Sequence, residues 1–183
     1  MADGMTTAAE TAGALYERDF HAWTQAQAAA LRAAAVSAGA EGAAASDAPL
    51  DHGNLAEEIE SLGRSDREKV EARIARIIEH LLKLECSPST VPRAGWRATV
   101  REARAALARS FKHSPSLHRV AREAVEEETA GAARTAAEAL ADHGEDASLV
   151  RARLDGGGYT AEQVLGDWWP ASPPPAGPPS PFP

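Results

Sequence analysis

The chain has 183 residues, of which 44% are hydrophobic and only 5% aromatic, and it carries a formal net charge of -8 at pH 7. The length suits one domain, and the acidic balance argues against non-specific binding to nucleic acid or to an anionic membrane as its dominant property. Cys86 is the single cysteine, which excludes an intrachain disulfide and a cysteine-rich zinc site and suits a reducing cytosol. No apolar run approaches the roughly 20 residues that span a bilayer, and the N-terminus lacks the pattern of a secretory signal. We therefore expect a cytoplasmic protein.

Both ends of the chain and one internal stretch lack the periodicity of a helix. Residues 1–11 are predicted to form a disordered N-terminus, and residues 170–183, eight of them proline, a disordered tail. Small and polar residues with glycine and proline at about 38–50 predict a flexible connection. The remainder, residues 12–169, is predicted to be a single all-helical domain that contains this connection.

Five main helices are predicted in chain order, over about residues 12–38, 51–62, 66–86, 94–112 and 114–142. Gly63 and the capping-box pattern Ser65–Glu68 predict a break between the second and the third. Short helical segments are expected at about 145–154 and 159–169. The predicted fold class is therefore all-α, a helical bundle of about five main helices with a short C-terminal helical segment.

Apolar residues at helical spacing give the candidate core positions. In the first helix these are Leu15, Phe20, Trp23, Ala30 and Leu31. The widest apolar stripe belongs to the third helix and consists of Val70, Ile74, Ile77, Ile78, Leu81, Leu82 and Leu84. A stripe of that width is typical of a helix in the middle of a bundle.

The second predicted helix places polar side chains at i, i+3, i+4 and i+7, which puts them on one face. They are Asn54, Glu57, Glu58 and Ser61. The adjoining face carries Leu55, Ile59 and Leu62. Such a cluster suits a functional site, a contact surface or a solvated face, and the sequence leaves all three readings open.

One hypothesis for the polar face at 54–61 is that it takes part in metal binding or acid–base chemistry. Glu57, Glu58 and His80 would supply oxygen and nitrogen ligands for a divalent metal ion, or an acid and a base, and Glu60 or Asn54 could complete the set. The sequence has neither a Glu-x-x-His pair nor an HExxH motif. A histidine at the edge of an apolar stripe is more often neutral and hydrogen-bonded within the protein. We predict no cofactor and leave a divalent metal ion open.

A basic stripe lies on the helix predicted at 94–112. Between Arg93 and His113 there are five arginines and one lysine against a single glutamate, and Arg97, Arg101 and Arg104 recur at i, i+4 and i+7. The stripe suits nucleic-acid phosphates or a carboxylate-rich partner. The acidic helices of the same chain offer an internal alternative, in which these arginines pair within the fold or are simply solvated.

Several strings of the sequence resemble the family known as domain of unknown function 29. They include YERDFHAWTQAQAAALR at 16–32, NLAEEIESLGRSDRE at 54–68, GWRATVREAR at 95–104 and YTAEQVL at 159–165. The resemblance extends over most of residues 15–169 and implies an all-helical, soluble, bacterial protein. It implies no reaction and no catalytic residues.

Three functional hypotheses follow. The leading one is a non-catalytic helical interaction or regulatory module that binds a protein partner or a second copy of itself. The alternative is a metal-dependent hydrolase or nuclease that uses Glu57, Glu58 and His80. A weaker alternative is nucleic-acid binding through the basic helix at 94–112, which the acidic net charge disfavours.

Overall fold

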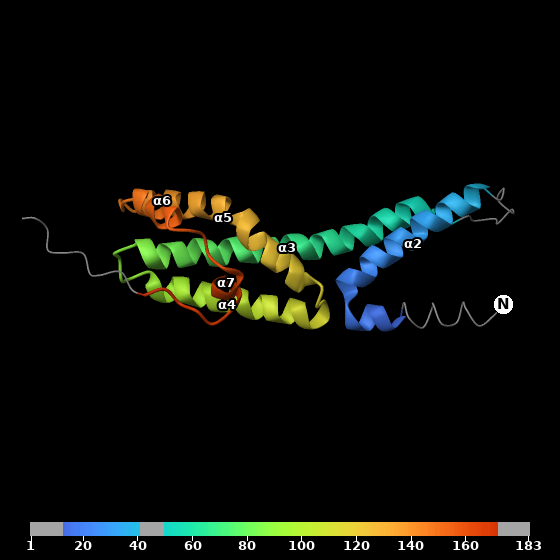
Figure 1. The fold of residues 1–183 in the computed structure, drawn as a ribbon, viewed down its shortest axis with the longest axis horizontal. Coiled ribbons are helices and arrows are strands. Elements are labelled where there is room, and N and C mark those ends of the chain that lie inside the picture. The colour runs from blue at the N-terminus through green and yellow to red at the C-terminus, as the bar shows by residue number, and fades with distance from the viewer. Residues whose placement is uncertain (1–12, 41–49, 172–183) are drawn as a thin grey trace, which may run out of the picture. The chain divides into compact units, whose positions relative to one another are not determined.

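Figure 1 shows the computed structural model, which describes residues 13–40 and 50–171. Helical residues 13–18 are followed by α2 (Phe20–Ala40), α3 (His52–Cys86), α4 (Arg93–His113), α5 (Leu117–Asp142), α6 (Ser148–Asp155) and α7 (Ala161–Leu165). No strand occurs in the described ranges, and the all-α prediction is confirmed. None of the helices described there is long and apolar enough to cross a membrane.

Three of the expectations fall largely on residues outside these ranges. They are the disordered N-terminus at 1–11, the flexible connection for residues 41–49, and the proline-rich tail from residue 172 onward. These stay predictions. At the edges of the gaps, α2 continues to Ala40, and Pro170 is buried.

The chain divides into two compact units, and α3, α4 and α5 each contribute to both. Unit 1 contains the chain up to Val70 together with Arg109–Val120, and unit 2 contains Glu71–Ala108 together with the chain from Ala121 onward. The prediction of one domain over residues 12–169 stays a prediction, and each unit is described by itself.

Unit 2 is built around the second half of α3. All six of its large apolar residues are fully buried, namely Ile74, Ile77, Ile78, Leu81, Leu82 and Leu84. This confirms the apolar stripe expected from the sequence. Val100 and Leu107 of α4 are buried as well, as are Val125 and Leu140 of α5. Because burying one such side chain contributes about 1.5–3 kcal/mol, this stripe is the main source of cohesion in the unit.

Unit 1 contains a break between two helical segments that the sequence analysis did not predict. Asp19 separates helical residues 13–18 from α2, so the prediction of one helix over 12–38 is wrong at this point. The Asp19 carboxylate accepts a hydrogen bond from the Ala22 backbone N–H at 3.0 Å, as a helix N-cap does. It also accepts bonds from the Ser116 N–H at 2.7 Å and the Ser116 hydroxyl at 2.8 Å. Asp19 thus fixes the start of α2 to the turn that precedes α5.

The buried residues of α2 differ from those expected. Leu15, Phe20, Trp23 and Leu31 are only partly buried, and Ala30 is exposed. The fully buried positions are Thr24 and Ala28, with exposed fractions of 0% and 1%. Small side chains occupy this face because α2 lies close to the first half of α3, where Ala56 and Gly63 are buried.

The predicted break at Gly63 is also wrong, because α3 runs without interruption from His52 to Cys86. Gly63 is needed for packing instead. A Cβ atom at this position would overlap Thr24 Oγ1 and lie 3.2 Å from Gln25 Nε2 and 3.3 Å from Thr24 Cβ. The glycine lets the two helix backbones approach closely, and the Ser65–Glu68 pattern lies inside the helix rather than at its start.

We expect Gly63→Ala to destabilise the protein by roughly 1–3 kcal/mol, because the added methyl group overpacks the contact with Thr24. Urea unfolding followed by circular dichroism would measure the change.

Gly131→Ala is the matched control, because Gly131 also lies inside a helix and a Cβ there meets no atom within 4 Å. That variant should be neutral or stabilised by up to about 1 kcal/mol from helix propensity. An equal increase in the free energy of unfolding in both variants would contradict the packing role of Gly63.

Candidate functional site

The polar face predicted at 54–61 lies at the start of α3, and two of its members are engaged locally. The Asn54 amide donates to Asp51 Oδ2 at 2.6 Å, and its backbone N–H donates to Asp51 Oδ1 at 3.0 Å. These bonds hold the pKa of Asp51 below its usual value and cap the helix. The Ser61 hydroxyl donates to the Glu58 carbonyl at 2.9 Å. Asn54 and Ser61 therefore have structural roles here.

The acidic members of this region face different surroundings. Glu57 and Glu58 are exposed, whereas Glu60 is paired with Arg32 of α2. The hydrogen bond and charge of Arg32 lower the pKa of Glu60. Sequence analysis missed Arg32, since pairing across a hairpin depends on how α2 and α3 are aligned. The only signal was one isolated arginine in an alanine-rich helix.

The hairpin of α2 and α3 has a polar edge and an apolar edge, on opposite sides of the line of contact marked by Thr24 and Gly63. The polar edge carries Arg32 and Glu60, which form an ion pair with each other. Gln25 also lies on this edge, beside Gly63. Helical geometry of about 100° per residue places Leu55 and Leu62 more than about 120° from Glu60 around α3. They lie on the other edge.

This apolar edge is exposed. Leu55 and Leu62 have exposed fractions of 41% and 45%, and Ile59 between them is partly buried. The same helical geometry brings Ala30 and Ala34 of α2, both exposed, to this edge. Sequence analysis assigned the leucines to an apolar stripe, but α3 turns its small residues toward α2 and leaves the leucines at the side.

The metal candidate is not assembled within the described residues. Glu57 and Glu58 belong to unit 1 and His80 to unit 2, and about six turns of α3 separate them along the helix. Residues 13–40 and 50–171 contain no group of three or more His, Cys, Asp or Glu side chains that could hold a metal ion. The metal-dependent alternative stays a prediction without geometric support.

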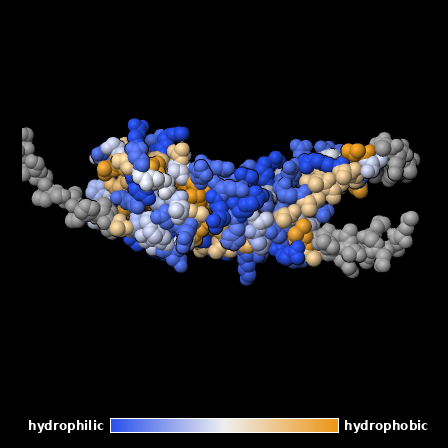
Figure 2. All heavy atoms as spheres, viewed as in Figure 1, coloured by the Kyte–Doolittle hydropathy of each residue, from blue (hydrophilic) through white to orange (hydrophobic). Residues whose placement is uncertain are grey.

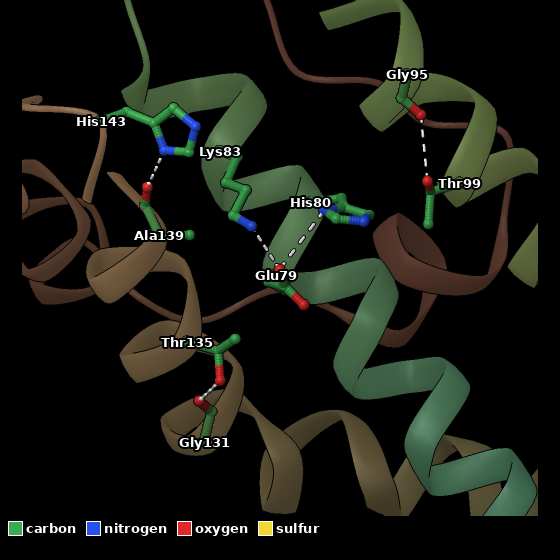
Figure 3. A network of polar contacts seen from close by, with 9 residues as sticks. All are labelled: Glu79, His80, Lys83, Gly95, Thr99, Gly131, Thr135, Ala139 and His143. Atoms are coloured by element: carbon green, nitrogen blue, oxygen red, sulfur yellow. Dashed lines mark hydrogen bonds and ion pairs between the residues drawn. The ribbon is translucent and has the colours of Figure 1, made fainter. Parts of the chain in front are cut away.

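His80 lies among buried residues of α3 with an exposed fraction of 9%. Figure 3 shows its neighbours Glu79 and Lys83, which form an ion pair with each other at 2.5 Å. The His80 Nδ1 atom is 3.8 Å from Glu79 Oε1, beyond hydrogen-bond distance, and it is a buried atom without a partner in the described chain. Burial lowers the pKa of His80, and the attraction of Glu79 offsets this only in part.

Two of the three arginines in the basic stripe of α4 hold the C-terminal segment in place. The Arg104 guanidinium donates to the backbone carbonyls of Val164 at 2.9 Å, Gln163 at 2.7 Å and Trp168 at 3.0 Å. Arg97 and Arg104 also lie over the Trp169 ring, each 5.0 Å from its centroid. Their main partners are carbonyls and a ring rather than the carboxylates that the sequence suggested.

The third arginine of the stripe, Arg101, is exposed. A guanidinium that satisfies several carbonyls is a structural clamp, because it pairs groups that a short helix leaves without partners. Burial lowers the pKa of Arg104, and nearby Asp167 opposes this shift. The stripe is therefore split between packing and solvent, and it does not form a continuous row of available cations.

A second clamp in unit 2 centres on Glu85 near the end of α3. Its Oε2 atom accepts hydrogen bonds from Arg153 Nε and from the Tyr159 hydroxyl, both at 2.6 Å. Arg153 also lies over the Tyr159 ring, 4.8 Å from its centroid. Burial and this bond raise the pKa of Tyr159. Burial also raises the pKa of Cys86 to about 11, which keeps the thiol protonated and poorly nucleophilic at neutral pH.

These features define an all-α protein in which Arg97, Arg104, Arg153 and Glu85 hold segments of unit 2 together, while unit 1 leaves apolar and polar edges exposed. The chain belongs to the family described as Domain of unknown function DUF29, whose family model matches residues 15–169. This confirms the resemblance seen in the sequence. No curated protein and no solved structure is significantly similar to the chain.

We expect Arg104→Met to lower the free energy of unfolding by roughly 1.5–3 kcal/mol, because three carbonyls lose a charged donor. Hydrogen exchange at residues 163–169 should accelerate in the same variant, since these residues lose their link to α4.

Arg101→Met on the same helix is the control and should change neither quantity, because Arg101 is exposed. Unchanged exchange in Arg104→Met would contradict the clamp.

We expect the free energy of unfolding to fall as the pH is lowered from 7 to 5, in part because of His80. Its pKa is lowered in the folded protein, so below about pH 6.5 the unfolded chain binds a proton that the folded chain resists. Above that pH both forms are neutral, and His80 adds no pH dependence.

Urea titrations at pH 7 and pH 5 would show a smaller decline for His80→Gln than for the wild type. His113→Gln, which removes an exposed histidine, is the control. Identical declines in the wild type and His80→Gln would contradict this account.

Proposed function

We propose that the chain is a non-catalytic helical interaction module of the bacterial cytoplasm, and that the apolar edge of the α2–α3 hairpin binds an amphipathic helix of another protein. The observation that carries the proposal is the exposure of Leu55 and Leu62 on one edge of two packed helices. A row of apolar side chains one or two turns apart is the surface that accepts a partner helix in helix-in-groove recognition.

The apolar character of this surface extends to α2. In Figure 2, the colours of hydrophobic residues run along α2, whose sequence from residue 26 onward is mostly alanine. Exposed alanines allow a partner helix to approach closely, because they add little bulk. Leu55 and Leu62 then supply the larger contacts at its side.

The charge beside this edge indicates the kind of partner. Glu58 is exposed and lies one turn from both Leu55 and Leu62 on α3. An amphipathic helix with a lysine or arginine next to its apolar face would complement this carboxylate, and such complementary charges fix orientation and speed association. We therefore assign a basic amphipathic helix to this edge.

The cytoplasm is the proposed compartment because a single cysteine with a protonated, buried thiol needs no oxidising environment. The metal-dependent and nucleic-acid alternatives lack comparable support. The first has no assembled ligand group in the described ranges, and the second would need Arg97 and Arg104, which contact Trp169.

The test is a binding measurement with a protein captured on the immobilised chain and then purified. We expect the double variant Leu55→Asn, Leu62→Asn to weaken its binding by at least tenfold while keeping the circular dichroism spectrum, because both leucines are exposed in the free protein. Glu58→Lys should weaken binding mainly through a slower association rate.

Leu149→Asn is the matched control, since Leu149 on α6 is 43% exposed and belongs to unit 2. It should leave binding unchanged. Equal affinity of the double variant and the wild type would refute the docking surface. A wild-type dimer in analytical ultracentrifugation that the double variant abolishes would assign the edge to a second copy and overturn the proposed partner.

A further inference from the structure

A groove of about 680 Å³ lies between α5 and α6, which are neighbours within unit 2 (Figure 1). The volume lies within the range of small-molecule sites, roughly 300–1,000 Å³. Six of its ten lining residues are apolar and lie at helical spacing on the two helices. They are Ala130, Ala133 and Ala137 of α5 and Ala147, Val150 and Leu154 of α6.

The groove stays open because small side chains face each other across it. Four of the six apolar residues are alanines, whose single methyl groups do not fill the space between two helices. Val150 and Ala133 are its buried members, with exposed fractions of 2% and 9%. An apolar space that the protein leaves unfilled lacks the dispersion contacts of a packed interior, and an apolar ligand would supply them.

The shape of the groove favours a linear ligand over a partner helix. Its lining extends from Ala130 to Ala137 on α5 and from Ala147 to Asp155 on α6, about 10–12 Å along each helix. Because α6 has only eight residues, it is too short to flank a partner helix over an interface of the size that stable complexes bury. A single apolar chain matches these dimensions better.

Two cations line the same groove and are available. Arg134 of α5 and Arg151 of α6 are exposed, and neither side chain forms an ion pair or a hydrogen bond with another residue that the structure describes. The one carboxylate of the lining, Asp155, is bonded to neither of them, so the lining carries a net positive charge. This differs from Arg104 and Arg153, whose guanidinium groups are engaged within the fold.

We propose that this groove binds a fatty acid, with the hydrocarbon chain along the alanines and the carboxylate at Arg134 and Arg151. Guanidinium groups pair with a carboxylate through parallel N–H···O bonds, and an apolar chain gains free energy with each methylene that leaves water. A neutral apolar ligand would use only the first feature of the groove, and a short carboxylate only the second. All of these residues belong to unit 2, so the inference does not depend on the partner helix proposed for unit 1.

Isothermal titration of the full chain with dodecanoate, below its micelle-forming concentration, tests the inference. We expect saturable binding at one site per chain. Hexanoate, which keeps the head and shortens the chain, should bind at least tenfold more weakly. Dodecyltrimethylammonium, which keeps the chain and reverses the charge, should also bind at least tenfold more weakly, because it meets two arginines.

The double variant Arg134→Gln, Arg151→Gln should weaken dodecanoate binding about tenfold or more, because it removes both partners of the carboxylate. Its matched control is Arg101→Gln, Arg122→Gln, which removes two exposed arginines of unit 2 that lie outside the groove. The control should bind like the wild type. Circular dichroism of each variant verifies that the helices are retained.

A third pair of variants tests the apolar part. Ala137→Leu fills the groove and should weaken binding at least tenfold, whereas Ala141→Leu, at an exposed alanine of α5 outside the groove, should not. The variant Leu55→Asn, Leu62→Asn should bind dodecanoate like the wild type, which separates this site from the edge in unit 1.

The proposal is overturned if dodecanoate does not bind saturably or if Ala137→Leu keeps full affinity. It is also overturned if dodecyltrimethylammonium binds as tightly as dodecanoate, or if the two double arginine variants weaken binding equally, since the arginines of the groove would then have no specific role.

Discussion

The close approach of α2 and α3 at Gly63 determines how unit 1 presents its side chains. Because the glycine has no Cβ, Thr24 lies directly against the α3 backbone, and the small residues Ala28 of α2 and Ala56 of α3 are buried as well. A contact made of small residues is narrow. It leaves Leu55 and Leu62 of α3 at one side and Glu60, which pairs with Arg32, at the other, so the hairpin has an apolar edge and a polar edge.

Unit 2 uses its charged residues differently. Arg104 and Arg153 each combine hydrogen bonds with an aromatic ring, and together they hold the segment from Tyr159 to Trp169 against α3 and α4. That segment contains only the short helix α7, and a five-residue helix does not form stably by itself. The clamps supply the tertiary contacts that such a helix needs. A guanidinium over an aromatic ring serves this purpose well, because it keeps its charge while most of its surface is covered.

Burial favours the neutral form of three ionisable groups in unit 2. Burial keeps the Cys86 thiol protonated, and it favours the neutral form of His80. The Tyr159 hydroxyl is a donor to Glu85 and stays protonated. In each case the same burial that stabilises the fold opposes the charged form that a nucleophile or a base would require.

Sequence by itself determined the helical class, the apolar stripe from Val70 to Leu84 and the family, since these depend on local periodicity and on residue strings. It could not determine how Gly63 is used. The same glycine suits a helix end or a close helix contact, and only the position of Thr24, 39 residues earlier in the chain, decides between them. Arg32 with Glu60, Asp19 with Ser116 and Arg104 with the carbonyls of residues 163–168 are likewise pairs distant in sequence. Tertiary structure alone brought them together, because helical periodicity assigns a residue to a face but leaves open which element that face meets.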